Sequence, residues 1–257
     1  MFSIRKILYF LSIPLIVILI MAFKDFADDK KLETIKNRNT DQGFAVVELF
    51  TSEGCSSCPP ADELIAELEQ DKSNKQLYIM AFHVDYWNHQ GWRDRFSNSK
   101  FTARQKQYAK WLQLPLLYTP QLIINGKMEM VGSATSKVIS GINSVIQETH
   151  LEQLKLKAES IKDETIQVGY TSTSTVKNTA ILVALVQKQA SSAVSAGENA
   201  GKALSHVQVV RDLQSRRLKK QDSFTFKLPV PNMQWEIIAF EQDLASGEII
   251  DITSIDL

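Results

Sequence analysis

The chain has 257 residues, of which 44% are hydrophobic and 23% charged, so it can bury a sizeable core and is not a disordered protein. Lysine plus arginine and aspartate plus glutamate both number 29, and the formal net charge is zero. No net field therefore favours nucleic acid, an anionic bilayer or a polyanionic substrate, and we expect no nucleic acid among the partners.

An uninterrupted apolar run, residues 7–23, follows Arg5 and Lys6 at the N-terminus. Its length is at the short edge of what spans a membrane, and it exceeds the apolar core of most signal peptides. Both interpretations mean export. Because no clear cleavage site follows, we expect an anchor over residues 1–23, tethering the protein to the periplasmic side of the inner membrane; a removed signal segment and secretion is the alternative. Paired cysteines can persist as a disulfide in that compartment.

Residues 24–43 are polar and of mixed charge, which is typical of a linker. Apolar periodicity and turn residues then predict alternating strands and helices. The strands are expected over residues 44–50, 76–87, 121–124 and 128–131, and the helices over residues 59–71, 99–114 and 136–150. This order is that of a small α/β domain spanning residues 44–150.

The remaining residues, 151–257, show a different pattern. Apolar and polar side chains alternate with period two in about seven segments, which predicts strands with one wet face and suits a two-sheet sandwich. Residues 188–205 are rich in alanine, serine and glycine and are expected to form a long loop. The predicted fold class is therefore an α/β domain followed by an all-β, sandwich-like domain, after an N-terminal apolar helix.

The chain has two cysteines, Cys55 and Cys58, which lie between the first predicted strand and a helix that opens at Pro59. An attacking sulfur must be a thiolate, and free N–H groups at a helix N-terminus stabilise an anion. Cys55 is the candidate nucleophile, and Cys58 can resolve a mixed disulfide on it. A purely structural disulfide across so short a loop would stabilise the fold by only about 2 kcal/mol, so redox chemistry is favoured.

Thr119-Pro120 directly precedes the strand predicted to start at Gln121. A proline is awkward there unless it opens the strand, and a cis bond would turn the chain sharply. Together with the cysteine pair, this arrangement resembles the thioredoxin superfamily, in which a cis-proline loop faces the cysteines and pairs with the substrate peptide. The resemblance implies a thioredoxin-like fold over residues 44–150, with Thr119 and Pro120 binding substrate.

Four blocks carry a narrower resemblance: ELFTSEGCSSCPPAD, FHVDYWNHQGWRDRFS, FTARQKQYA and YTPQLIING. In this order they look like a secreted, thioredoxin-like family of bacteria that is catalogued only as a domain of unknown function. We therefore expect an exported thiol-disulfide oxidoreductase that acts on protein or peptide thiols and needs no cofactor besides its own disulfide. The Ser56-Ser57 dipeptide does not fix the direction of electron flow, and the redox partner is open.

Glu48 is a carboxylate inside the first apolar strand, seven positions before Cys55. Thioredoxin has a buried acid nearby that assists proton transfer, one residue closer to its cysteine. Glu48 could thus act as a base for Cys58. Alternatively, it points to a sheet edge or pairs with a basic group.

Aromatic and titratable residues crowd the connection after the second strand, residues 83–94. Connections at the carboxyl ends of strands in an open α/β sheet are where ligands bind, so Trp87 and Trp92 could form a wall beside Cys55 that selects the substrate. The alternative is an insertion packed by its own aromatic rings.

Two other function classes stay open. Cys55 and Cys58 with His83 and His89 formally supply zinc ligands, and copper held by both thiolates and His83 is geometrically easier because soft ligands suit Cu(I). The third class is a non-catalytic binding module.

Overall fold

The computed structural model describes residues 43–71, 76–89, 91–151, 153–162, 164–229 and 233–257. The predicted anchor at residues 1–23 and the predicted linker, except for residue 43, lie outside this range. Within it, no helix is both long and apolar enough to cross a membrane.

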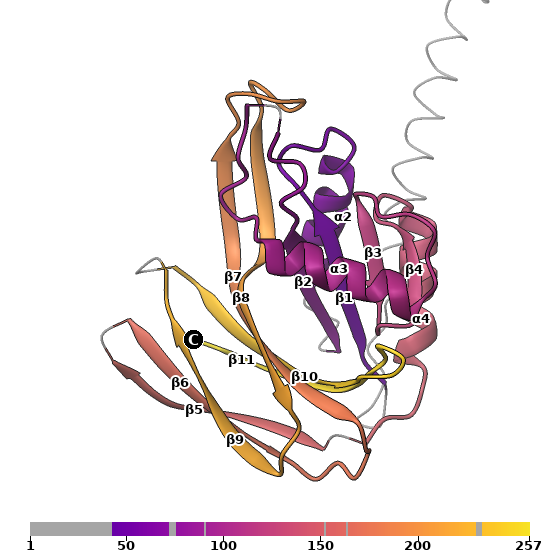
Figure 1. Ribbon diagram of the computed structural model, residues 1–257, viewed down its shortest axis with the longest axis vertical. Helices are drawn as coiled ribbons and strands as arrows, with labels where there is room; N and C mark the ends of the chain where they lie inside the picture. The colour runs from indigo at the N-terminus through magenta and orange to yellow at the C-terminus, as the bar shows by residue number, and fades with distance from the viewer. Residues whose placement is uncertain (1–42, 72–75, 90, 152, 163, 230–232) are drawn as a thin grey trace, which may run out of the picture. The chain divides into compact units, whose positions relative to one another are not determined.

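The described elements alternate between strand and helix first and are all strands afterwards (Figure 1). The first group is β1 (Ala45–Thr51), α2 (Pro59–Gln70), β2 (Leu77–His83), α3 (Ser99–Trp111), β3 (Gln121–Ile124), β4 (Met128–Val131) and α4 (Thr135–Ile146). The second group is β5 (Leu154–Lys162), β6 (Thr165–Ser172), β7 (Thr179–Ala193), β8 (Ala203–Arg217), β9 (Gln221–Lys227), β10 (Trp235–Asp243) and β11 (Ile249–Asp256).

The strands form two sheets. The larger has eight strands in the order β11-β10-β7-β8-β2-β1-β3-β4, and the smaller has three in the order β5-β6-β9. The larger sheet is mixed, since β1 runs parallel to β2 but antiparallel to β3. Its two halves meet where β8 pairs with β2 through Ala81 and Val209.

The predicted fold class is wrong. Because β8 lies beside β2, the strands β7, β8, β10 and β11 continue the sheet that β1 to β4 begin, instead of building a separate sandwich. The described residues are mostly β, with three short helices, and are not a thioredoxin-like α/β unit followed by a β-sandwich. A loop was predicted over residues 188–205, but residues 188–193 and 203–205 belong to strands β7 and β8, and only residues 194–202 connect them.

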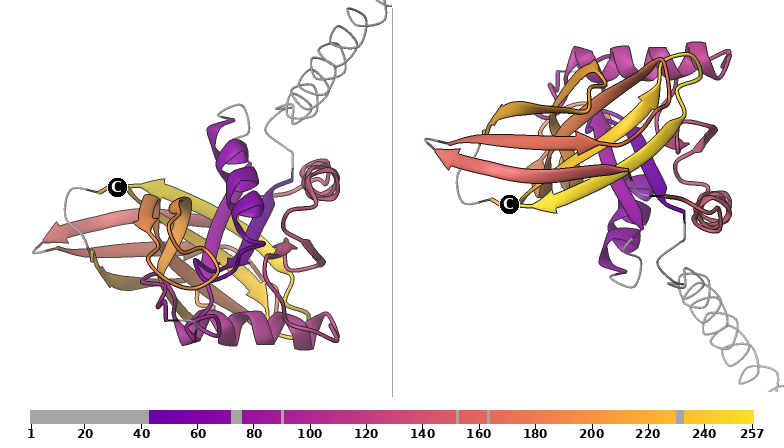
Figure 2. Two further views of the ribbon diagram at one scale, coloured as in Figure 1. Left: turned by 90° about the horizontal axis from the view of Figure 1, so that it is seen from above. Right: turned by 90° about the horizontal axis from the view of Figure 1, so that it is seen from below.

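Successive side chains of a strand point to opposite faces of the large sheet, so part of the hydrophobic core lies on each face. On one face, Phe50 and Phe82 pack against Phe101 and Tyr108 of α3. In Figure 2, α2 and α3 lie on opposite sides of β1 and β2. A second cluster lies where side chains of β7 and β10 meet those of the small sheet, with Phe224 among its fully buried rings. Burying such a ring stabilises the fold by roughly 1.5–3 kcal/mol.

The strand register determines which loops meet. In the parallel pair, Thr51 at the end of β1 is opposite His83 at the end of β2. In the antiparallel pair, Gln121 at the start of β3 is opposite Phe50. The loop after β1, the loop after β2 and the Pro120 loop before β3 therefore meet at one edge of the sheet.

Candidate functional site

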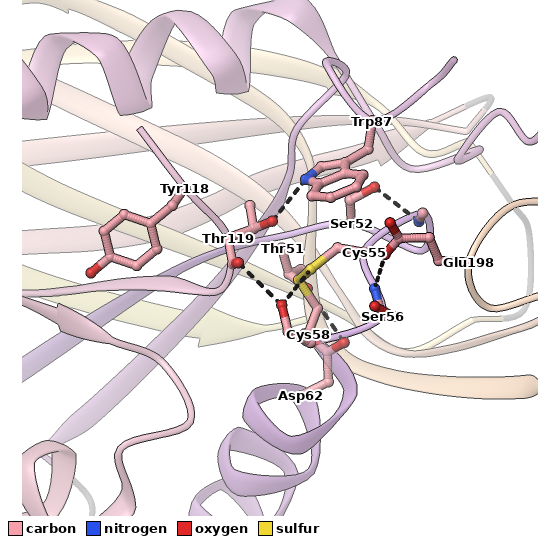
Figure 3. The surroundings of a disulfide bond; sticks show 12 residues. Thr51, Ser52, Cys55, Ser56, Cys58, Asp62, Trp87, Tyr118, Thr119 and Glu198 are labelled. Carbon is pink, nitrogen blue, oxygen red and sulfur yellow. Dashed lines mark hydrogen bonds between the residues drawn. A yellow bond between two sulfur atoms is a disulfide. The ribbon is translucent and has the colours of Figure 1, made fainter. Parts of the chain in front are cut away.

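The cysteine loop connects β1 to α2 at this edge. Cys55 and Cys58 form a disulfide, with their Cα atoms 5.4 Å apart (Figure 3). The loop is closed by the Cys55 N–H, which donates to the Ser52 carbonyl at 3.1 Å, and the helix then begins at Pro59, where a missing N–H costs nothing. Both cysteines are 0% exposed. Solvent therefore does not reach the disulfide in this arrangement.

The Thr119-Pro120 bond is cis and faces the cysteine loop. The Ser57 hydroxyl is 3.4 Å from the Cys55 Sγ and donates to the Thr119 carbonyl oxygen, also at 3.4 Å. Figure 3 shows the Thr119 backbone directly across from the sulfurs. The structure thus brings together the cysteine pair and the two residues predicted to bind substrate.

The two predicted tryptophans take different places in the site. The Trp87 ring lies over the cysteine loop, and its Nε1–H donates to the Thr119 hydroxyl at 2.7 Å (Figure 3). The Trp92 Nε1–H instead donates to the Glu53 Oε2 at 2.8 Å. Trp87 therefore joins the cysteine and proline loops, whereas Trp92 holds a carboxylate two residues before Cys55.

Glu48 is fully buried, but its carboxylate is already hydrogen-bonded to other side chains. Arg104 donates to both carboxylate oxygens, from Nε at 2.5 Å and from Nη2 at 2.8 Å, and the Tyr108 hydroxyl donates to Oε1 at 2.5 Å. Burial opposes the charge on Arg104, yet the Glu48 carboxylate outweighs it and raises the pKa of the guanidinium. This is the alternative in which Glu48 pairs with a basic group, and it leaves Cys58 without a base at that position.

Asp62 is the acid that lies near the disulfide, and sequence reasoning missed it. It follows Cys58 by four residues on α2, hence one helical turn away, and is only 6% exposed. Burial raises its pKa to about 7, although the charge of His206 and a hydrogen bond from the Thr51 hydroxyl lower it. The signal was an acid in the first turn of the helix that follows the cysteines.

Further buried titratable groups surround Asp62. His206, on β8, has Nδ1 3.8 Å from the Asp62 Oδ2 and Nε2 3.6 Å from the Glu53 Oε1. Its ring contacts that of His83, whose Nδ1 is 2.7 Å from the Asp94 Oδ2. Burial disfavours the charged form of Asp94, but the charge and hydrogen bond of His83 outweigh it and lower the pKa.

Several atoms of this group have no hydrogen-bond partner among the described residues: both His206 ring nitrogens, the His83 Nε2 and the Glu53 Oε1. Buried polar atoms are normally hydrogen-bonded. A row of partly unsatisfied proton-binding groups therefore extends from Asp62, next to the cysteine loop, into the core.

The metal alternative gains no support from these positions. In the ranges that the structure describes, no three His, Cys, Asp or Glu side chains are arranged to hold a metal ion. His83 is bound to Asp94, and His89 Nδ1 lies 2.8 Å from the Tyr86 carbonyl oxygen. Copper and zinc binding by Cys55, Cys58 and the histidines stay predictions.

The tip of the β7–β8 hairpin covers the cysteine loop, a feature absent from the predictions. Asn199 is fully buried, and its Nδ2 donates to the carbonyl oxygens of Glu53 and Cys55, both at 2.9 Å. The Glu198 carboxylate accepts the Ser56 N–H at 3.0 Å (Figure 3). Two residues from the second half of the chain thus bind the backbone of the loop that carries the disulfide.

A family model described as a protein of unknown function, DUF1223, matches residues 46–240. The chain belongs to this family. The match includes the cysteine loop, the cis proline and the covering hairpin, and it confirms the resemblance to a family catalogued as a domain of unknown function. No curated protein matches the DUF1223 chain.

Two solved structures are similar to the DUF1223 chain. A crystal structure of a protein from Agrobacterium tumefaciens is 24% identical, with a TM-score of 0.62, over 85% of this chain and 96% of that one. HBP35 of Porphyromonas gingivalis is 15% identical, with a TM-score of 0.57, over 86% of this chain and 77% of that one. At such identities the likeness shows the fold alone.

Proposed function

We propose that this DUF1223 protein is a thiol-disulfide oxidoreductase acting on protein or peptide thiols, with the Cys55-Cys58 pair as its redox centre. The observation that carries the proposal is the pair's position, at a helix start and across from Thr119-Pro120. A disulfide closing so short a loop does little as a brace. The local resemblance of the cysteine and proline loops to the thioredoxin superfamily supports the same chemistry.

In the reductive direction the protein starts as a dithiol. The Cys55 thiolate attacks a substrate disulfide, one sulfur leaves as a thiolate, and a mixed disulfide forms on Cys55. Cys58 then loses its proton and attacks the Cys55 sulfur, which releases the second substrate thiolate and forms the Cys55-Cys58 disulfide. The substrate gains two electrons, and the dithiol loses them. A dithiol partner must reduce the protein again, and the oxidative direction reverses every step.

We assign Asp62, in place of Glu48, as the group that accepts the proton of Cys58. It lies one helical turn from Cys58, and burial raises its pKa to about 7, which suits a group that takes and returns a proton near neutral pH. Glu48 already holds Arg104 and Tyr108. The buried His206 ring lies beside Asp62, with its Nδ1 3.8 Å from the Asp62 Oδ2.

The proposed setting is the periplasmic side of the inner membrane, anchored or secreted, as the apolar run at residues 7–23 indicates. An oxidising compartment allows the pair to cycle between disulfide and dithiol. The substrate edge consists of Thr119 and Pro120, with the Trp87 ring beside them.

Insulin reduction and refolding of scrambled ribonuclease test the proposal. We expect the wild type to accelerate at least one of them and Cys55→Ser to lose the acceleration. Glu148→Gln, a change at an exposed position outside the cysteine loop and the covering hairpin, serves as a control that should retain it. Equal rates for wild type and Cys55→Ser in both assays would favour a non-catalytic binding module instead.

A further inference from the structure

The covering hairpin bears on how Cys55 becomes reactive. Its tip, residues 194–202, is tied together by backbone hydrogen bonds from Val194 to Lys202 and from Gly201 to Val194. Lys202 also donates to the Asn199 side-chain oxygen at 2.9 Å, which orients the Asn199 amide toward the cysteine loop. The tip is thus an ordered unit, and its three hydrogen bonds with the loop come from two adjacent residues, Glu198 and Asn199.

The contact made by Glu198 competes with the chemistry of the site. The Ser56 N–H belongs to the residue directly after Cys55, at the start of the turn into α2. Backbone N–H groups in such a position stabilise a thiolate. The Glu198 carboxylate occupies this donor and adds a negative charge next to the sulfur, and both effects disfavour the Cys55 thiolate.

The contact made by Asn199 restricts access. Its amide binds the Cys55 carbonyl from a fully buried position, and Cys55 itself has no exposed surface. A thiolate must approach a sulfur in line with the bond that breaks, so an attack on Cys55 requires part of this cover to move. Asn199 and Glu198 of the tip hold the loop through hydrogen bonds to its backbone, and Trp87, which also lies over the loop, packs against the hydrophobic core as well.

We propose that the β7–β8 tip is a latch on the nucleophile, with Asn199 and Glu198 as positioning residues that hold Cys55 covered and less acidic until a substrate displaces them. This inference rests on the proposed function for the biological role of the latch. The test below measures the reactivity of Cys55 itself and does not depend on that function. When the tip leaves, the Cys55 sulfur is uncovered and the Ser56 N–H becomes free to bind the thiolate. Substrate binding and nucleophile activation are then one event.

The test follows alkylation of Cys55 by iodoacetamide in the Cys58→Ser background, where it is the single remaining thiol. Rates are measured from pH 5 to pH 10 by mass spectrometry. With Glu198→Gln we expect the midpoint of the pH–rate profile to fall, so that alkylation at pH 6.5 is about threefold faster, and high salt to reduce this difference. Because Glu198 is exposed, the variant should fold as the parent does.

Glu148→Gln is the matched control, because Glu148 is also exposed and its carboxylate lies 3.7 Å from the Nζ of Lys127 instead of on the cysteine loop. Asn199→Ala should instead raise the rate plateau at high pH severalfold, since it removes the two hydrogen bonds by which Asn199 holds the tip on the cysteine loop. If the pH–rate profile of Glu198→Gln coincides with that of Glu148→Gln, Glu198 does not disfavour the Cys55 thiolate. If the high-pH plateau of Asn199→Ala is unchanged, Asn199 does not restrict access to Cys55. Neither readout needs turnover, so failure of the oxidoreductase assays is a separate result.

Discussion

Asp62 lies one turn after Cys58 on α2, and its backbone N–H donates to the Cys58 carbonyl oxygen at 3.1 Å. The helix therefore fixes the carboxyl relative to the Cys58 sulfur. Asp62 carries no hydrogen bond from Arg or Lys among the described contacts, and its acceptor bond comes from the Thr51 hydroxyl at 3.3 Å. Burial raises the pKa of Asp62 to about 7, which suits proton exchange near neutral pH, whereas the Glu48 oxygens accept hydrogen bonds from Arg104 and Tyr108.

The first prediction concerns stability against pH. The folded pKa of Asp62 is raised to about 7 from an ordinary value near 3.8, so its contribution to stability is fully present below pH 4 and is lost as pH rises toward 7 and beyond. Asp62→Asn should remove this loss. We expect the variant to gain stability relative to the wild type between pH 4 and pH 8, by up to about 4 kcal/mol.

Urea unfolding of the oxidised proteins at several pH values measures this difference. Asp71→Asn, at the C-cap of α2, is a control at the other end of the same helix. A constant difference between Asp62→Asn and wild type across the pH range would contradict a titrating, buried Asp62.

The second prediction concerns the resolving step. In Asp62→Asn, Cys58 has lost its proton acceptor, so single-turnover release of a mixed disulfide on Cys55 should slow by about 10²-fold or more at pH 6–7 and recover at pH 9, where hydroxide removes the proton. Formation of the mixed disulfide should be unchanged. Stopped-flow measurement with a chromogenic disulfide separates the two steps, and equal slowing of both would argue against the assigned role.

The third prediction concerns Glu48 as a structural residue. Glu48→Gln leaves the buried Arg104 charge without its partner and should destabilise the fold by about 3–5 kcal/mol. The double variant Glu48→Gln, Arg104→Met removes both charges and should recover part of that loss. Chemical denaturation measures both effects. If the single variant is as stable as the wild type but resolves mixed disulfides slowly, Glu48 is a proton carrier after all.

The fourth prediction concerns the joined sheet. The core on the α3 side includes Leu182, Val186, Val210 and Phe240 from the second half of the chain. A fragment ending at residue 150 loses these side chains and exposes the edge of β2, so it should not fold cooperatively. Circular dichroism during thermal melting checks this expectation. A sharp melting transition for that fragment would show that residues 44–150 form an independent domain.

Local signals in the sequence were sufficient to predict where the cysteine loop and the proline turn lie. Pro59 and Pro60 can occupy only the first turn of a helix, and Pro120 only the start of a strand, so both positions followed from backbone chemistry. The long-range pairings were not readable in this way. Period-two alternation reports that a strand has one buried face, but not which strand it pairs with, and the contact between Ala81 and Val209 joins positions far apart in the chain.

The same limit applies at the site. The sequence left open whether Glu48 carries a proton or pairs with a basic group, because its partner, Arg104, is on a helix whose position depends on the tertiary fold. Asp62 looked like an ordinary first-turn acid, and only the packing of β8 and its His206 against α2 buries it. Asn199 and Glu198 reach the cysteine loop from more than 140 positions away, across a hairpin that composition alone made look like a loop.

Trapping of a mixed disulfide tests the redox role of the cysteine pair most directly. Reduced Cys58→Ser protein is incubated with a disulfide-containing peptide, and the product is identified by mass spectrometry without reductant. We expect one covalent adduct, on Cys55, that wild-type protein does not accumulate because Cys58 releases it. If Cys58→Ser forms no adduct while a small free thiol in the same mixture does, the pair is not a redox centre.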